Sequence, residues 1–200
     1  MMSVTAFHPD NRFMAETKRE AICDAALSLF ASQGIDATST RQIAKRAGTA
    51  EGNIYRHFRG KDALVRHLFE ENAMALHQTL AEAVDEADDP LERLGALVRG
   101  VFAFAADQPV GFAFLFMVST TGAFHDDPAE WPLPMMLFAQ TLKGGFRSGD
   151  FRPVDPALAT GWIVAMTQRA VILHRTGIVR LGYDALVDQT VEAVQHLLRR

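Results

Sequence analysis

Two short helical segments that meet at Gly48 constrain the fold of this chain more than any other feature. Ser39 and Gln42 have the spacing of a capping box, which predicts a short helix that ends at the glycine. A second helix is predicted from residue 49 or 50 to Phe58. Helices joined by so short a turn need a small residue at their crossing, which Ala44 supplies, and glycine can take the positive φ of the turn. This spacing predicts a helix-turn-helix.

A longer amphipathic helix is predicted before this pair, over residues 17–32. Thr17 and Glu20 have capping-box spacing at its start, and Gly34 can stop it in a left-handed conformation. Its apolar residues recur at helical spacing and are Ile22, Ala25, Ala26, Leu29 and Phe30. We expect the three helices to share a small core made of Leu29, Phe30, Ile43, Ile54 and Phe58. Such a core leaves the remaining faces of the third helix free.

Positive charge gathers on this part of an otherwise acidic chain. The formal net charge of the 200 residues is −4, yet residues 38–67 hold seven Lys or Arg against two acidic residues. The seven are Arg41, Lys45, Arg46, Arg56, Arg59, Lys61 and Arg66. Charge alone allows two interpretations, a solvated surface or a surface that binds nucleic acid.

The second helix of a helix-turn-helix fits the major groove of double-stranded DNA. Asn53 and Arg56 can form hydrogen bonds to bases, and nearby polar and basic side chains are placed for phosphates, so we expect both kinds of contact. The phosphate contacts expected are Thr40, Arg41, Tyr55, His57 and Lys61. The full set of candidate DNA-binding residues is Thr40, Arg41, Thr49, Ala50, Glu51, Asn53, Tyr55, Arg56, His57 and Lys61.

Residues 17–65 resemble the N-terminal domain of the TetR family of bacterial transcriptional regulators. The resemblance rests on the motifs AALSLFASQG and STRQIAKRAGTAEGNIYRHFRGKDAL, above all on Tyr55 and Phe58 followed by Lys61. It implies a homodimer that binds a palindromic operator, usually as a repressor, and releases the DNA when a small molecule enters the C-terminal domain. It also implies that Lys61 and Tyr55 touch backbone phosphate.

Glu51 departs from the family pattern, because relatives often carry a polar or basic residue at this position of the recognition helix. A carboxylate can accept a hydrogen bond from cytosine N4, but it repels phosphate. We therefore expect Glu51 either to read a base or to turn away from the DNA.

The rest of the chain also has helical periodicity, without repeats or low-complexity linkers, so we expect an all-α protein. The predicted helices run from about residue 62 to 84, from 90, from 109, from 135 to 146, from 156 to 174 and from 183 to 198, with a loop over 120–134. The expected division is a flexible N-terminal arm (1–14), a helix-turn-helix DNA-binding domain (15–62) and a ligand-binding and dimerisation domain (63–200).

The last two predicted helices are more apolar around their circumference than a lone surface helix should be. Their apolar residues are Trp162, Ile163, Met166, Ala170, Leu173, Leu186, Val187, Val191, Val194 and Leu198. We expect the two helices to pair with their copies in a four-helix dimer interface, as the TetR resemblance also implies. The alternative is ordinary burial within one chain.

Phe and Met side chains crowd the middle of the C-terminal domain. Most such residues belong to a core, but soft Phe and Met walls also suit a cavity for an apolar or aromatic effector. The candidate ligand-binding residues are Phe102, Phe114, Met117, Met135, Phe138, Trp162, Met166 and Arg169. Further polar groups for such a cavity are His125, Gln140, Gln168 and His174.

Enzymatic function is not expected, because the chain has no phosphate-binding GxxxxGK[ST], no HExxH and no GxSxG motif. The loop residues 125–127, His-Asp-Asp, cannot by themselves build a preformed metal site, so we expect neither metal nor cofactor. The single cysteine, Cys23, lies in an apolar helical pattern and is expected in a core. The alternative function is a helix-turn-helix regulator without a small-molecule ligand, which acts as an activator or through a protein partner.

We expect a cytoplasmic protein with no membrane association. The apolar stretch Val110–Val118 is shorter than the roughly 20 residues of a membrane span, and the N-terminal MMSVTAFHPDNR lacks the apolar core of a signal peptide.

Overall fold

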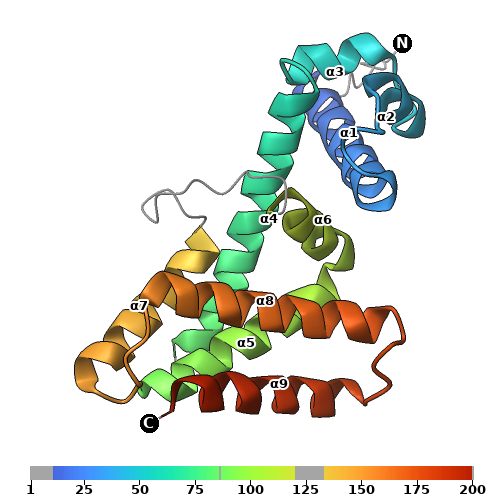
Figure 1. Cartoon of the computed structure of the whole chain (residues 1–200). Coiled ribbons are helices and arrows are strands. Elements are labelled where there is room, and N and C mark those ends of the chain that lie inside the picture. Colours follow the sequence, from blue (N-terminus) through green and yellow to red (C-terminus); the bar gives the residue numbers. More distant parts are fainter. Residues whose placement is uncertain (1–10, 86, 120–132, 200) are drawn as a thin grey trace, which may run out of the picture. The chain divides into compact units, whose positions relative to one another are not determined.

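The computed structural model describes residues 11–85, 87–119 and 133–199, and within these ranges the regular elements are all α-helices (Figure 1). They are α1 (Asn11–Gln33), α2 (Thr40–Arg46), α3 (Glu51–His57), α4 (Lys61–Val84), α5 (Pro90–Asp107), α6 (Pro109–Ser119), α7 (Leu133–Ser148), α8 (Pro156–Arg175) and α9 (Tyr183–Leu198). The expected all-α class is confirmed. The chain divides into two compact units, Met1–Phe69 and Glu70–Arg200, and the boundary between them falls within α4 rather than at the expected residue 62.

The first helix is longer than expected. It begins at Asn11, so the predicted start at Thr17 is wrong, and residues 11–14 belong to a helix rather than to a flexible arm. Residues 11–17 contain neither Gly nor Pro, so no residue interrupts helix propagation before Thr17. The remainder of the expected arm, residues 1–10, lies outside the described residues. The helix ends as expected at Gly34, whose φ is +89°.

The helix-turn-helix is present as predicted. The Ser39 side chain accepts a hydrogen bond from the backbone N–H of Gln42, and the Gln42 side chain accepts one from the backbone N–H of Ser39. Gly48 turns the chain into α3 with a φ of +64°. The residues that close the small core are Phe30, Ile43, Ala44, Ile54 and Phe58, all buried, whereas Leu29 is half-buried.

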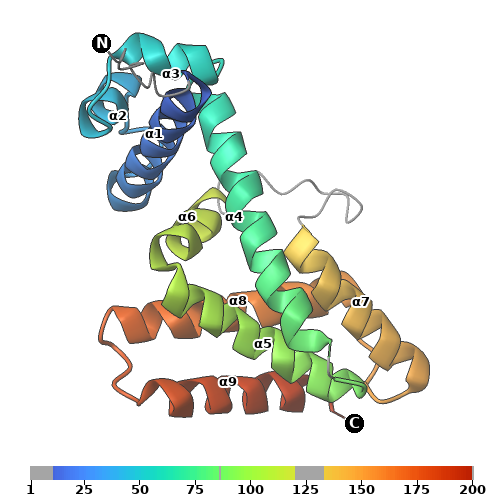
Figure 2. The same ribbon diagram turned by 180° about the vertical axis from the view of Figure 1, so that it is seen from behind.

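The C-terminal unit is built around α5, which packs against α6, α7, α8 and α9 (Figures 1 and 2). The Asp89 carboxylate caps this helix by accepting hydrogen bonds from the N–H groups of Leu91 and Glu92, and Pro90 follows at the first helical position. The large buried side chains of this core include Leu94, Leu97, Val98, Phe102, Phe104, Phe112 and Phe114. Five of these residues belong to α5 and two, Phe112 and Phe114, to α6, so α5 contributes most to this core.

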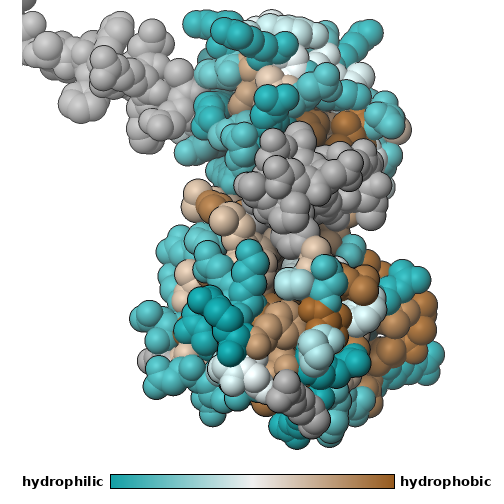
Figure 3. All heavy atoms as spheres, turned by 60° about the vertical axis from the view of Figure 1, so that its left-hand side comes forward, coloured by the Kyte–Doolittle hydropathy of each residue, from teal (hydrophilic) through white to brown (hydrophobic). Residues whose placement is uncertain are grey.

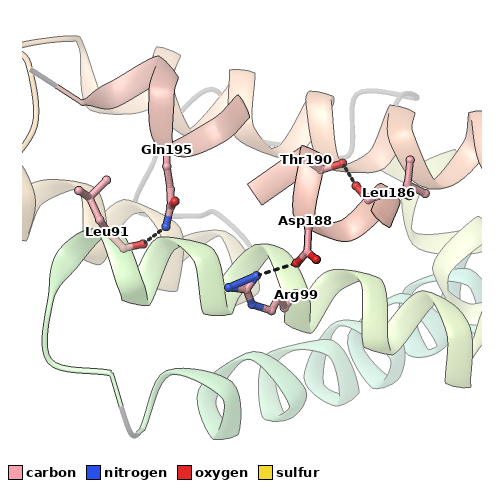
Figure 4. A network of polar contacts seen from close by, with 6 residues as sticks. All are labelled: Leu91, Arg99, Leu186, Asp188, Thr190 and Gln195. Atoms are coloured by element: carbon pink, nitrogen blue, oxygen red, sulfur yellow. Dashed lines mark hydrogen bonds and ion pairs between the residues drawn. The ribbon is translucent and has the colours of Figure 1, made fainter. Parts of the chain in front are cut away.

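Helices α5 and α9 approach closely because α5 carries a glycine at their contact. A Cβ atom on Gly95 would lie 3.1 Å from Nε2 of Gln195 and 3.2 Å from the Val191 side chain. The Gln195 side chain uses this proximity to donate a hydrogen bond to the Leu91 carbonyl over 2.9 Å (Figure 4). Further along the same pair of helices, Arg99 and Asp188 form an exposed ion pair at 3.7 Å.

The predicted boundaries of the C-terminal helices hold with one correction. Leu133 and Pro134 were expected in the 120–134 loop but form the start of α7, where proline is accepted because a first-turn N–H needs no helical partner. The rest of that predicted loop, residues 120–132, lies outside the described residues, as do His125 and the His-Asp-Asp sequence.

The ten apolar residues named for the last two helices do not all face one internal core, as expected, since only half of them are buried; the pairing of these helices with a second copy stays a prediction. Ile163, Leu186, Val191, Val194 and Leu198 are buried within their own unit. Helix α9 therefore places its apolar stripe on α5 and α8, and the larger exposed apolar side chains of the pair lie on α8, where Leu158 is 48% and Trp162 37% exposed.

Helix α8 is long and apolar enough to cross a membrane by length and composition, with a mean hydropathy of 1.2, as is the pair α5 and α6 if its 115° bend is ignored. Buried helices of soluble proteins meet the same criterion. Only 28% of the α8 window is buried in the unit, so α8 presents apolar surface that its own unit leaves uncovered.

Gly145 on α7 provides a test of the packing after α7. The Phe151 ring, buried to 1% exposure, lies where a Cβ atom of residue 145 would stand, at 2.3 Å. We expect Gly145→Ala to lower the free energy of unfolding of the C-terminal unit by about 1–3 kcal/mol through overpacking. The measurement is urea unfolding followed by tryptophan fluorescence, since both tryptophans lie in this unit.

Gly144→Ala is the matched control, because a Cβ atom at that position meets no atom within 4 Å. Alanine has the higher helix propensity, so this variant should be as stable as the parent or more stable by up to about 1 kcal/mol. Equal destabilisation by both variants would contradict the packing described for Phe151.

Candidate nucleic-acid interface and effector cavity

The outer face of the helix-turn-helix carries basic side chains without partners. Arg41 and Lys45 on α2, Arg56 on α3 and Arg59 after it are exposed, and none forms a hydrogen bond or ion pair with the residues that the structure describes. Tyr55 stands beside Arg56 with 56% of its side chain exposed. Helical geometry explains this arrangement, because Ile54 points into the core and the residues that follow it are rotated by about 100° each.

Glu51 contacts α2. Its carboxylate accepts a hydrogen bond from the Thr40 hydroxyl over 2.5 Å, and the Tyr55 hydroxyl lies 3.5 Å from the same Thr40 oxygen. Three predicted DNA-binding residues are thus brought together in one polar cluster. The cluster links the two helices of the motif and engages the Glu51 carboxylate within the protein.

Asn53, the other residue expected to read bases, also has an internal partner. Its amide Nδ2 donates a hydrogen bond to the Thr49 hydroxyl over 2.6 Å, and the side chain is half-buried. An asparagine amide has two N–H donors and a carbonyl acceptor, so one donor and the acceptor remain for another partner. His57 is half-buried at the end of α3, with its ring centroid 6.5 Å from that of Phe58.

Lys61 has a structural role that its sequence context does not reveal. Its ammonium donates hydrogen bonds to the carbonyl oxygens of Ile35, at 2.8 Å, and Thr38, at 3.2 Å. Both carbonyls belong to the loop between α1 and α2, so Lys61 fixes that loop to the start of α4. An ammonium has three N–H donors, which leaves one for a phosphate.

Two further interactions position the motif and were not expected from the sequence. Arg46 donates a hydrogen bond to the Ser28 hydroxyl over 2.7 Å, which joins α2 to α1. The Arg19 guanidinium lies 5.5 Å from the centre of the Phe58 ring, and an Arg19 nitrogen lies 2.9 Å from Nε2 of His67. A cation over an aromatic face is attractive, so these residues hold Phe58 between α1 and α4. Periodicity could not reveal such pairs, because their members lie 18 to 48 positions apart.

A cavity of about 380 Å³ lies in the C-terminal unit between α6 and α8. Its walls are Phe112, Ala113, Phe116, Met117, Gln168, Ile172, Arg175 and Thr176. Of the eight predicted ligand-binding residues only Met117 lines it, and of the further polar candidates only Gln168 does. Apolar walls with a few polar groups are typical of a site for a small organic ligand.

The other seven predicted ligand-binding residues lie elsewhere. Phe102, Phe114 and Phe138 are core residues with at most 2% exposure. Met135 and Met166 are half-buried, and Trp162 and Arg169 are exposed on α8. Aromatic rings bury the largest areas, so these phenylalanines of α5, α6 and α7 lie in the core rather than on a cavity wall.

Lys61 gives a test of the loop anchor. We expect Lys61→Met to lower the free energy of unfolding of the N-terminal unit by about 1–2 kcal/mol, because two carbonyl oxygens lose a charged donor. Urea unfolding measured by circular dichroism checks this, with tryptophan fluorescence of the C-terminal unit as the internal reference. Arg59→Met is the control, since Arg59 is exposed and has no partner among the residues that the structure describes, and it should change stability by less than about 0.5 kcal/mol.

Comparisons with known proteins agree with the helix-turn-helix. Residues 22–68 match the family model described as bacterial regulatory proteins, tetR family. The transcriptional repressor KstR2 of Mycolicibacterium smegmatis is 31% identical over 94 residues, which are 47% of this chain and 46% of the repressor. KstR2 of Mycobacterium tuberculosis is 34% identical over 86 residues, 43% of each chain. The chain thus matches a little under half the length of these curated relatives.

Solved structures share the fold over nearly the whole chain. The ketosteroid transcriptional regulator KstR2 of Mycobacterium tuberculosis superimposes with a TM-score of 0.69 at 23% identity, covering 98% of this chain and all of that one. FadR of Bacillus subtilis, solved in complex with stearoyl-CoA, gives 0.68 at 22% identity, covering 88% of this chain and 97% of that one. Residues 22–68 thus match the tetR family of bacterial regulatory proteins, and the chain shares its fold with the solved structures.

Proposed function

We propose that this protein is a DNA-binding transcriptional regulator that represses by binding a palindromic operator as a homodimer, and that a small effector with a largely apolar body releases it. The observation that carries the proposal is the row of unpartnered cations around α3, in a chain whose net charge is negative. Exposed positive charges that lie close together repel one another and do not stabilise the fold. A polyanionic partner therefore explains their presence around α3 better than a role in stability does. If the partner is DNA, we expect the protein in the cytoplasm. Binding DNA requires no chemical catalysis by the protein.

The proposed DNA-binding residues form two groups, those that are exposed without internal partners among the described residues and those that also form bonds within the motif. Arg56 is exposed on the outer face of α3 and is free to form two hydrogen bonds to a guanine, as arginine commonly does in the major groove. Arg41 and Tyr55 flank it and suit phosphate. Thr40, Thr49, Ala50, Glu51, Asn53, His57 and Lys61 complete the proposed interface, in which several members also hold each other in place.

The dimer is proposed through α8 and α9. Along α8, Leu158, Gly161, Trp162 and Ala165 are exposed at spacings that put them on one side of the helix, and hydrophobic atoms interrupt the hydrophilic surface of this unit in Figure 3. Small residues allow a second helix to approach closely, and Trp162 offers a large area for burial. An exposed apolar face of this kind favours association with a copy of itself, in which each patch meets its equivalent.

The effector is proposed to occupy the cavity between α6 and α8. Its apolar walls fit an apolar compound, and the stearoyl-CoA bound to the structurally similar FadR supports an effector with an apolar part. The name of the KstR2 relative supports repression rather than activation. Such an effector is coupled to the operator if it binds the DNA-competent state and the released state with different affinities. A coupling free energy of 1–3 kcal/mol changes the affinity for the operator roughly 5- to 150-fold.

The DNA assignment is tested with fluorescence anisotropy on DNA tiles from the region that flanks the gene of this protein. We expect one tile to bind tightly with a steep dependence on salt, and Arg56→Ala to weaken that binding by about 1–3 kcal/mol and relax its sequence preference. Arg180→Ala is the control, because Arg180 is an exposed arginine between α8 and α9, outside the N-terminal unit. Equal binding by the Arg56→Ala variant and the parent on every tile would contradict the proposal.

The dimer assignment is tested by sedimentation velocity over a range of concentrations. Trp162→Glu places a charge in the proposed interface and should weaken dimerisation by at least about 2 kcal/mol, roughly thirtyfold. The variant should still fold, because Trp162 is 37% exposed in the single chain. Ile178→Glu, at a residue 71% exposed after α8, should leave the dimer unchanged. A fully dimeric Trp162→Glu protein would place the interface elsewhere.

A further inference from the structure

The cavity between α6 and α8 is chemically asymmetric. Phe112, Phe116 and Met117 of α6 form an apolar wall, in which the Phe112 and Phe116 ring centroids lie 4.5 Å apart. Helix α8 contributes Gln168, Ile172 and Arg175 to the opposite wall, and Arg175 lies about one helical turn after Ile172. An occupant of this cavity would therefore meet hydrocarbon and aromatic surface on one side and a cation on the other.

The charge of Arg175 is not neutralised by the residues that the structure describes. One guanidinium nitrogen, Nη1, donates a hydrogen bond to the Pro109 carbonyl at 2.8 Å, and Arg175 has no ion pair with a described residue. Among the residues that the structure describes, no acidic side chain lines the cavity. A guanidinium carries five N–H donors, so several remain after the bond to Pro109.

Tyr183, whose pKa Arg175 influences, does not supply a negative charge. Burial raises the pKa of the Tyr183 phenol, and the neighbouring Arg175 guanidinium lowers it by a smaller amount. The net pKa lies above the usual value of 10.0, so the phenol is neutral near pH 7. Its hydroxyl is also engaged, since it donates a hydrogen bond of 2.6 Å to the Phe102 carbonyl.

We propose that the effector is an amphipathic anion, whose apolar body lies on the Phe112, Phe116 and Met117 wall and whose anionic group pairs with Arg175. This inference rests on the proposed function and narrows its effector class from apolar compounds to apolar acids or their charged conjugates. Gln168, on the same helix, offers an amide donor to an oxygen of the anion. The bond to Pro109 holds the guanidinium at the cavity, which reduces the entropy that the side chain loses when it binds the anion.

A structural explanation of Arg175 makes a different prediction. An arginine in the last turn of α8 also complements the negative end of the helix dipole, and that role requires no ligand. It would affect stability alone, without distinguishing an acid from a neutral molecule of the same shape. Discrimination between such a pair of ligands therefore separates the two roles.

The probes are decanoate, its neutral counterpart decanamide, and decanoyl-CoA, with affinity measured by isothermal titration calorimetry on the full chain. We expect decanoate or decanoyl-CoA to bind the parent at least about tenfold more tightly than decanamide, because the anion gains a charge-assisted hydrogen bond. Decanoate as the tighter of the two anions indicates a free acid, and decanoyl-CoA as the tighter indicates a charged conjugate. Arg175→Gln should remove the preference for the anion, and Arg175→Lys should restore part of it.

Arg169→Gln is the matched control, because Arg169 is exposed on the same helix and does not line the cavity. It should retain the affinity and the selectivity of the parent. The assignment is overturned if decanamide binds as tightly as both anions, if Arg175→Gln keeps the preference, or if none of the three probes binds. Operator binding by the ligand-free parent, measured in parallel by anisotropy, tests the proposed function separately, so that a failed effector class is not mistaken for a failed regulator.

Discussion

Burial of Phe30, Ile43 and Ile54 is the constraint on which the N-terminal unit depends. Helices α2 and α3 have seven residues each, and helices this short are not stable alone in water. Their stability must come from packing against α1 and each other. Since Ile54 has to point into this core, the geometry of the helix sends Tyr55 and Arg56 outward. The same interaction that stabilises α3 thus determines which face of the helix is exposed, and this is the face that we propose for DNA.

Positive charge on this unit serves two purposes that composition cannot separate. Arg46 and Lys61 are among the seven basic residues of the 38–67 segment, yet both donate hydrogen bonds within the unit, to Ser28 and to the loop after α1. Arg41, Arg56 and Arg59 have no such partners. The internal hydrogen bonds hold the helices in position in the free protein. When the exposed cations contact phosphates, the side chains that are already bonded therefore lose little further conformational entropy.

The C-terminal unit places its large aromatic residues and its cavity in different regions. Helix α5, in contact with four other helices, takes Phe102 and Phe104 into the core. The cavity lies instead between α6 and α8, where half-buried residues such as Phe116 and Gln168 face each other. Burial of aromatic area stabilises the unit most where packing is complete, so the cavity proposed for the effector lies at the margin of the core, where polar groups can also reach it.

Patterns in the sequence are sufficient to predict the elements of local origin, which are the Ser39 cap, the turn at Gly48 and the proline starts of α5 and α8, and with them the all-α class and the helix-turn-helix. These follow from interactions between residues a few positions apart, which a pattern records. Tertiary structure alone decided that Lys61 would anchor a loop more than 20 residues away, that Glu51 would bond to Thr40, and that α9 would bury its apolar stripe within its own unit. It also decided that Arg175, rather than Arg169, would line the cavity. Arg169 lies in the middle of α8 and Arg175 at its last residue, and only the tertiary structure shows which of the two reaches the cavity beside α6.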